Sequence, residues 1–121
     1  NEARLTDADL TKANLKGAYL VKSLLVGAKL SGAILAGVNL RLSNLQGVNL
    51  CGADLREVNL RSANLVNANL SWANLTEASL SGALLRGACL TGVKLSGALM
   101  NWVDLNGADL DGVNLSDAKL S

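Results

Sequence analysis

Residues 62–75 read Ser-Ala-Asn-Leu-Val-Asn-Ala-Asn-Leu-Ser-Trp-Ala-Asn-Leu, and the motif Ala-Asn-Leu recurs in this stretch every five residues. The period extends across the chain, from Leu5 to Leu120, and 23 of its 24 positions hold leucine, the exception being Met100. Two residues before each of them lies a small residue, 16 times alanine, 6 times valine and 2 times serine. A repeat this regular predicts a stack of identical small units.

A period of five fits neither a helix nor a flat strand. On an α-helix, each five-residue step rotates by about 500°, so the leucines would spiral around the cylinder and form no stripe. On a strand, side chains alternate with period two, so successive leucines would lie on opposite faces. All the leucines can face one interior only if the chain turns once in every five residues.

One unit, residues 62–66, shows how such a turn is built. Ala63 and Leu65 are two residues apart, so on a short extended segment both point inward, while Asn64 and Val66 point outward. The position two residues after the leucine then lies at a corner. All 12 glycines of the chain occupy this one position, and glycine tolerates the positive φ angles that tight turns require.

Four such units make a square coil of 20 residues. Residues 1–121 then predict an all-β solenoid of about six coils, roughly 29 Å long at the usual spacing between paired strands. Leucine side chains fill its interior, and each contributes on the order of 1.5–3 kcal/mol when it is buried. The core is therefore large enough for independent folding.

The repeated unit Ala-(Asn/Asp)-Leu-X-X resembles the pentapeptide-repeat family. Clear examples are residues 8–10, 13–15, 53–55, 68–70, 73–75 and 108–110, and 13 of the 24 units carry Asn or Asp before the leucine. The resemblance covers Ala3 to Leu120. It implies a right-handed quadrilateral β-helix, and it is the family that supplies the handedness. The chain is accordingly expected to be one domain, residues 1–121, of 24 tandem repeats.

The two ends of this expected rod show repeats without a cap. Family members often carry a helix or another cap, and a solenoid end exposes core side chains and unpaired backbone groups. We therefore expect a fragment of a longer protein, or ends that pair with another copy. Opposite charges at the two ends favour head-to-tail stacking, with Lys12, Lys16, Lys22 and Lys29 near one end and Asp104, Asp109, Asp111 and Asp117 near the other.

The sequence indicates no catalytic, cofactor or metal site. It has no histidine, the commonest general base and metal ligand. Cys51 and Cys89 are expected two coils, or about 10 Å, apart, which is too far for a disulfide. No nucleotide-binding or nucleophile motif occurs. We therefore expect a protein that is not an enzyme and has no cofactor, and the unpaired cysteines favour a reducing compartment such as the cytoplasm.

One face of the expected rod is less polar than the others. Several apolar side chains should point outward on it or at its edge, and a contiguous apolar stripe would mark a partner-binding surface. This face is the candidate site for a protein partner. Its residues are Val21, Leu24, Val26, Leu42, Val66, Leu84 and Trp102.

The favoured function is a non-enzymatic structural module, either a spacer or a surface for protein–protein interaction. The alternative is a DNA-mimicking inhibitor or protector of DNA gyrase, as some proteins of the resembled family are. Duplex DNA carries one charge per about 1.7 Å, so a mimic of this length would need roughly −17, whereas the net charge is +1. Arg41, Arg56 and Arg61 form too small a patch to predict nucleic-acid binding, and no segment predicts a membrane span.

Overall fold

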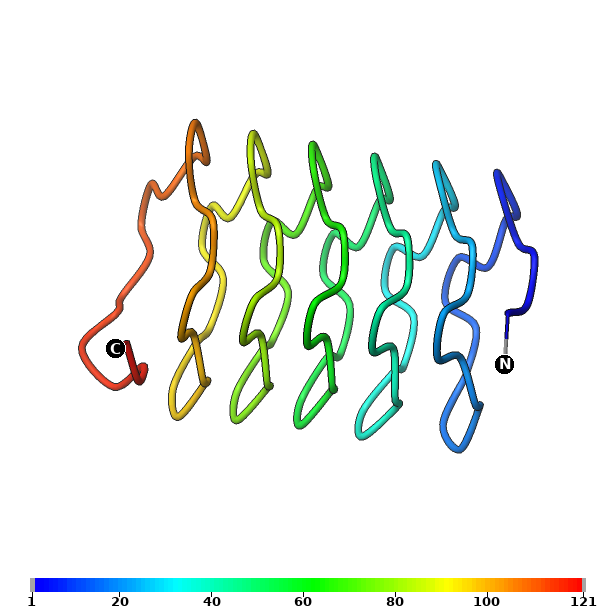
Figure 1. The fold of residues 1–121 in the computed structure, drawn as a ribbon, viewed down its shortest axis with the longest axis horizontal. Helices are drawn as coiled ribbons and strands as arrows, with labels where there is room; N and C mark the ends of the chain where they lie inside the picture. Colours follow the sequence, from blue (N-terminus) through cyan, green and yellow to red (C-terminus); the bar gives the residue numbers. More distant parts are fainter. Residues whose placement is uncertain (1, 121) are drawn as a thin grey trace.

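The computed structural model describes residues 2–120, which form a rod of stacked coils with the two chain ends at opposite ends of the rod (Figure 1). Residues 20 apart pair in parallel, as in the series Arg4–Leu24–Asn44–Asn64–Leu84–Asp104. The spacing of these pairs agrees with the coil that the period of five predicts. The number of coils and the right-handed twist remain predictions.

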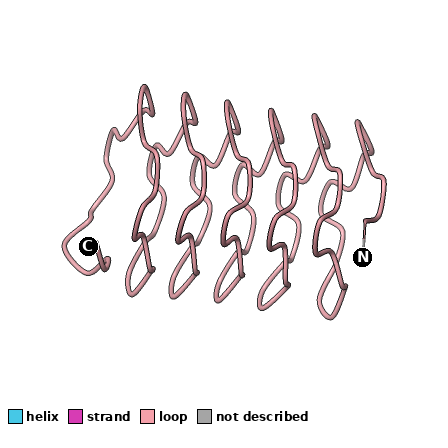
Figure 2. Cartoon of the chain, in the orientation of Figure 1, coloured by secondary structure: helices cyan, strands magenta, loops and turns pink. Residues whose placement is uncertain are grey.

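Pairing between coils occurs without continuous strands. Within residues 2–120 the backbone has no helix and no strand, only isolated bridges between turns (Figure 2). The expectation of an all-β fold is therefore corrected in one respect: the coils pair through single-residue bridges and not through β-strands. Because two of every five residues lie in a turn, each side of a coil is too short to pair by more than one bridge.

The core is the predicted ladder of large and small residues. From Leu25 to Leu95 every leucine of the series is at most 2% exposed, and the small residues beside them are buried. The ends are less covered: Leu5, Leu10 and Leu15 are only partly buried, while Leu110 is 37% and Leu120 is 55% exposed. Each interior coil is thus buried by its two neighbours.

The predicted corners are tight turns with positive φ at the position two residues after the core residue. In each turn the amide of the next small residue donates to the carbonyl of the core residue, as Ala68 N does to Leu65 O at 3.0 Å. All 12 glycines have positive φ there, and so do 10 other residues, from Asp7 (φ 58°) to Trp102 (φ 61°). Glycine is therefore favoured at the corners but is not needed at every one.

The polar residue before the leucine completes the backbone hydrogen bonding of the repeat. Around Leu65, the amides of residues 64, 65, 67 and 68 all donate to backbone carbonyls. The fifth amide, that of Val66, donates to Oδ1 of Asn64 at 3.0 Å. The same bond, to the amide two residues on, occurs in all 13 units that carry Asn or Asp. The preference for these residues thus follows from the need to satisfy the remaining donor.

Replacing Asn64 by alanine is expected to lower the free energy of unfolding by about 1 kcal/mol, the usual value of one net hydrogen bond. Urea denaturation followed by circular dichroism measures the change. Asn64→Asp is the matched control, because a carboxylate keeps the Oδ1 acceptor and should retain most of the stability. An Asn64→Ala variant as stable as the parent would show that water satisfies the Val66 amide equally well.

The last coil departs from the regular pairing between residues 112 and 117. Lys94 has no bridge to Asn114, whereas Cys89 pairs with Asp109 and Leu99 with Lys119. The Gly97 amide bonds to Asp117 O, where the pattern of the other coils would place Ser116. The segment therefore leaves the preceding coil and rejoins it before the end of the described chain, as the red end of the ribbon shows (Figure 1).

Candidate protein-interaction site

Within residues 2–120 no group of three or more histidine, cysteine, aspartate or glutamate side chains could hold a metal ion. Both cysteines are free thiols. Cys89 Sγ lies 3.1 Å from Ser71 Oγ and 3.4 Å from Thr91 Oγ1, and these hydrogen bonds lower the pKa of its thiol. Its side-chain hydrogen-bond partners are thus two hydroxyl groups, with no carboxylate between them to act as a base.

The basic patch considered for nucleic acid is partly neutralised. Arg56 pairs with Asp54, with Nη2 2.6 Å from Oδ2 and Nε 2.8 Å from Oδ1. This hydrogen bonding lowers the pKa of the Asp54 carboxyl below its usual value. The Arg56 cation of the patch is therefore already paired with a carboxylate at the surface.

The seven residues predicted for the apolar face are placed unequally. Leu42 is 42%, Leu84 40% and Trp102 85% exposed, while Leu24, Val26 and Val66 are half-buried. Val21, expected to point outward, is only 7% exposed. Val21 thus belongs to the covered part of the rod and offers almost nothing to a partner.

The apolar residues that remain fall into two groups and form no continuous stripe. Asn44 and Asn64 stand between Leu24 and Leu84 in the same column of bridges. The 20-residue repeat likewise places Ser62 and Gly82 between Leu42 and Trp102. Polar or small residues therefore separate an apolar group near the first coils from another near the last ones.

The second group is extended by a residue that the sequence pattern did not single out. Leu99, 38% exposed, lies on the neighbouring side of the rod, three residues before the corner that Trp102 occupies. Leu84 flanks the same column of corners from the other side, paired with Asp104. We call Leu84, Leu99 and Trp102 the apolar corner. Leu99 has the same place in the repeat as Leu24 and Leu84, directly before a core residue, but it lies on the neighbouring side of the coil, which the sequence analysis did not assign to the apolar face.

The two tryptophans differ in their surroundings. The ring of Trp72 lies over Gly92, the corner one coil further on, where it occupies the space that a β-carbon would need. Trp72 keeps 67% of its surface exposed, whereas Trp102 keeps 85%. At the edge of the apolar corner, Arg86 Nε lies 3.3 Å from Asp104 Oδ2. The corner therefore combines a large exposed aromatic ring with a charged rim, the pattern of many partner-binding sites.

No helix in residues 2–120 is long and apolar enough to span a membrane. No curated protein matches the chain. Among solved structures, a pentapeptide repeat protein from the thylakoid lumen of Arabidopsis thaliana is 31% identical, with a TM-score of 0.76, over 78% of this chain and 66% of that one.

Two cyanobacterial structures are also similar. A pentapeptide repeat protein of Cyanothece 51142 is 33% identical over 94% of this chain and 60% of its own, with a TM-score of 0.50. HetL of Nostoc, described as involved in heterocyst differentiation regulation, is 35% identical over 98% of this chain and 60% of its own, with a TM-score of 0.46. The chain thus spans 60–66% of the length of these three proteins.

The model of the family described as pentapeptide repeats matches in overlapping copies over residues 1–25, 23–61, 53–92, 63–101 and 85–121. These matches cover the sequence from its first residue to its last, and they agree with the 20-residue spacing of the bridges and with the leucine core. The chain therefore belongs to the pentapeptide-repeat family.

Proposed function

We propose that this chain is a non-enzymatic module for protein–protein interaction, held as a rigid spacer by its stacked coils. Its residues 1–121 act as one domain, a right-handed quadrilateral β-helix of about six coils. Two free thiols, Cys51 and Cys89, favour a reducing compartment such as the cytoplasm.

The observation that carries this proposal is the apolar corner. The apolar corner presents a tryptophan that is 85% exposed and two exposed leucines, whose apolar surface the rod itself leaves open to solvent. Aromatic anchors of this kind are enriched among the residues that dominate binding energy at interfaces. The other apolar group, around Leu24 and Leu42 in the second and third coils, has no aromatic side chain and is not part of the proposed interface.

The test compares two variants that place a charge in the two apolar groups. Leu84→Asp combined with Trp102→Ala should abolish recovery of a specific partner, because it removes the anchor and charges its surroundings. Leu24→Asp is the matched control and should retain most of the binding. Both variants must keep the circular dichroism spectrum and melting temperature of the parent. A folded double variant that recovers the same partners at the same yield would refute the apolar corner as the interface.

We also propose that copies of the rod associate end to end. The last coil exposes Leu110 and Leu120, and Leu5, Leu10 and Leu15 of the first coil are only partly buried. The first two coils together carry a net positive charge, whereas the last coil carries a net negative one. Sedimentation velocity should show concentration-dependent assembly that is weaker in 1 M salt than in 50 mM salt. Asp109→Lys with Asp111→Lys should reduce it, while Glu57→Lys, far from the ends, should not. A single monomer peak at all concentrations would refute the stacking.

A further inference from the structure

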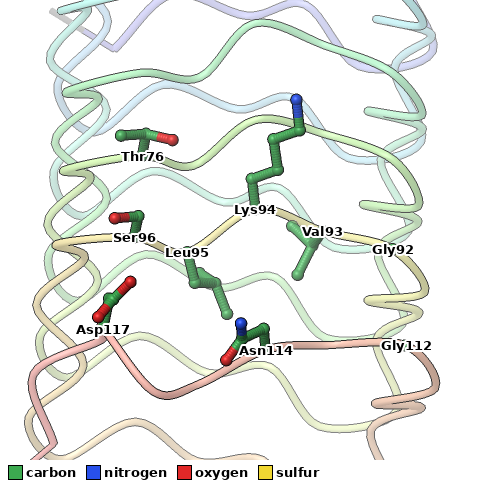
Figure 3. Close-up of a pocket in the computed structure, with 9 residues that line it drawn as sticks. All are labelled: Thr76, Gly92, Val93, Lys94, Leu95, Ser96, Gly112, Asn114 and Asp117. Carbon is green, nitrogen blue, oxygen red and sulfur yellow. The ribbon is translucent and has the colours of Figure 1, made fainter.

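The departure of the last coil opens a cavity of about 340 Å³ between residues 92–96 and residues 112–117. Figure 3 shows its walls, with Val93 and Leu95 on one side and Asn114 and Asp117 on the other. The Lys94 side chain extends away from this opening, toward the preceding coils. The cavity is of the size that protein pockets for small ligands have.

Two backbone groups on the wall of this cavity lack the partners that their counterparts have elsewhere. One coil earlier, the Leu75 amide donates to Lys94 O at 2.8 Å, and the Lys94 amide donates to Ala73 O at 3.1 Å. The equivalent bonds one coil further on would join the Leu95 amide to Asn114 O, and the Asn114 amide to Val93 O. Neither forms within the described residues. The wall therefore presents one free donor, at Leu95, and one free acceptor, at Val93.

These groups lie in a part of the rod that is otherwise closed to water. Val93 is 4% and Leu95 is 2% exposed, and buried backbone donors and acceptors in proteins are almost always paired. One residue of an extended chain can satisfy both, because its own N–H and C=O point to the same side. Its two neighbours would then point inward, toward Val93 and Leu95, because side chains alternate along an extended chain.

We propose that this cavity binds an extended peptide segment of the pattern apolar–X–apolar. The segment pairs with the backbone of Val93 and Leu95, in the place that Asn114 leaves open. This is recognition by addition to a sheet edge, where backbone bonds supply affinity and alternate side chains supply specificity. The carboxylate of Asp117 stands at the opening beside Ser96 (Figure 3). Segments with a basic residue at X are therefore preferred to acidic ones.

The site is separate from the apolar corner, so its test does not depend on the interface proposed there. The probe is the capped peptide Gly-Val-Lys-Leu-Ser, which copies residues 92–96 of the chain. In the free protein, hydrogen exchange followed by NMR should find the Leu95 amide exchanging at least about 100-fold faster than the Leu75 amide. Saturation with the peptide should slow the exchange of Leu95 while leaving that of Leu75 unchanged.

The matched control is the same peptide methylated on the backbone nitrogen of its lysine, which removes the donor to Val93 O. It should bind roughly tenfold more weakly, the factor that one lost hydrogen bond produces. A peptide with glutamate in place of the lysine should also bind more weakly. The proposal is wrong if the Leu95 and Asn114 amides are already protected in the free protein, because the last coil then closes the gap itself. Equal binding of the methylated peptide, or no binding at millimolar concentration, would also overturn it.

Discussion

Replacing Leu65 by alanine should lower the free energy of unfolding by about 2–5 kcal/mol, the range measured for large-to-small changes in closed cores. Leu65 is 0% exposed, and the core leucines before and after it, Leu60 and Leu70, are equally buried. Coils above and below are held by backbone hydrogen bonds, such as that from the Leu65 amide to Leu84 O at 2.7 Å. The surroundings therefore cannot collapse easily into the space left behind. Urea denaturation with far-UV circular dichroism measures the loss.

Leu120→Ala is the matched control, since it removes the same atoms at the same position of the repeat. Leu120 is 55% exposed, so its truncation should cost less than about 1 kcal/mol. A Leu65→Ala variant that lost no more stability than Leu120→Ala would mean that the coils move together to fill the cavity. The rod would then be more deformable than its hydrogen bonding indicates.

The core and the corners follow from the sequence because both depend only on the period. A chain that must bury a leucine every five residues has to turn once per unit, and the turn places one residue at positive φ. The structure confirms this at Gly52 (φ 67°) and equally at Glu57 (φ 58°). The inward position of Ala63 and Leu65, both 0% exposed, follows from the same reasoning.

The features that sequence reasoning missed depend on contacts between particular neighbours. The period marks Asn64 as outward and polar, but the need for its Oδ1 becomes clear only when every backbone amide is followed to its acceptor. Val21 occupies a position that usually faces outward, yet it is 7% exposed. Leu99 joins the apolar corner because the chain bends there, so residues of two sides meet around Trp102. The gap beside Lys94 breaks the period, and no change of motif at residues 112–116 announces it.

Gly92→Ala should be more destabilising than Gly52→Ala, although both glycines belong to the same column of corners and have nearly the same φ, +65° and +67°. Nothing lies within 4 Å of a β-carbon built on Gly52. Its replacement should therefore cost only the conformational strain, roughly 1–2 kcal/mol. A β-carbon on Gly92 would overlap the ring of Trp72. The ring must then move, which raises the expected loss to about 2–4 kcal/mol.

A double-mutant cycle separates the strain of the backbone from the overlap with the ring. In a Trp72→Ala background, Gly92→Ala should cost no more than Gly52→Ala does in the parent, because the side chain that opposes the new methyl group is gone. Urea denaturation of the four proteins of the cycle gives the coupling energy. If Gly92→Ala costs the same with and without the tryptophan, the ring of Trp72 moves aside freely. The ring and the new methyl group would then have no coupling energy, and the glycine would be required only for its positive φ.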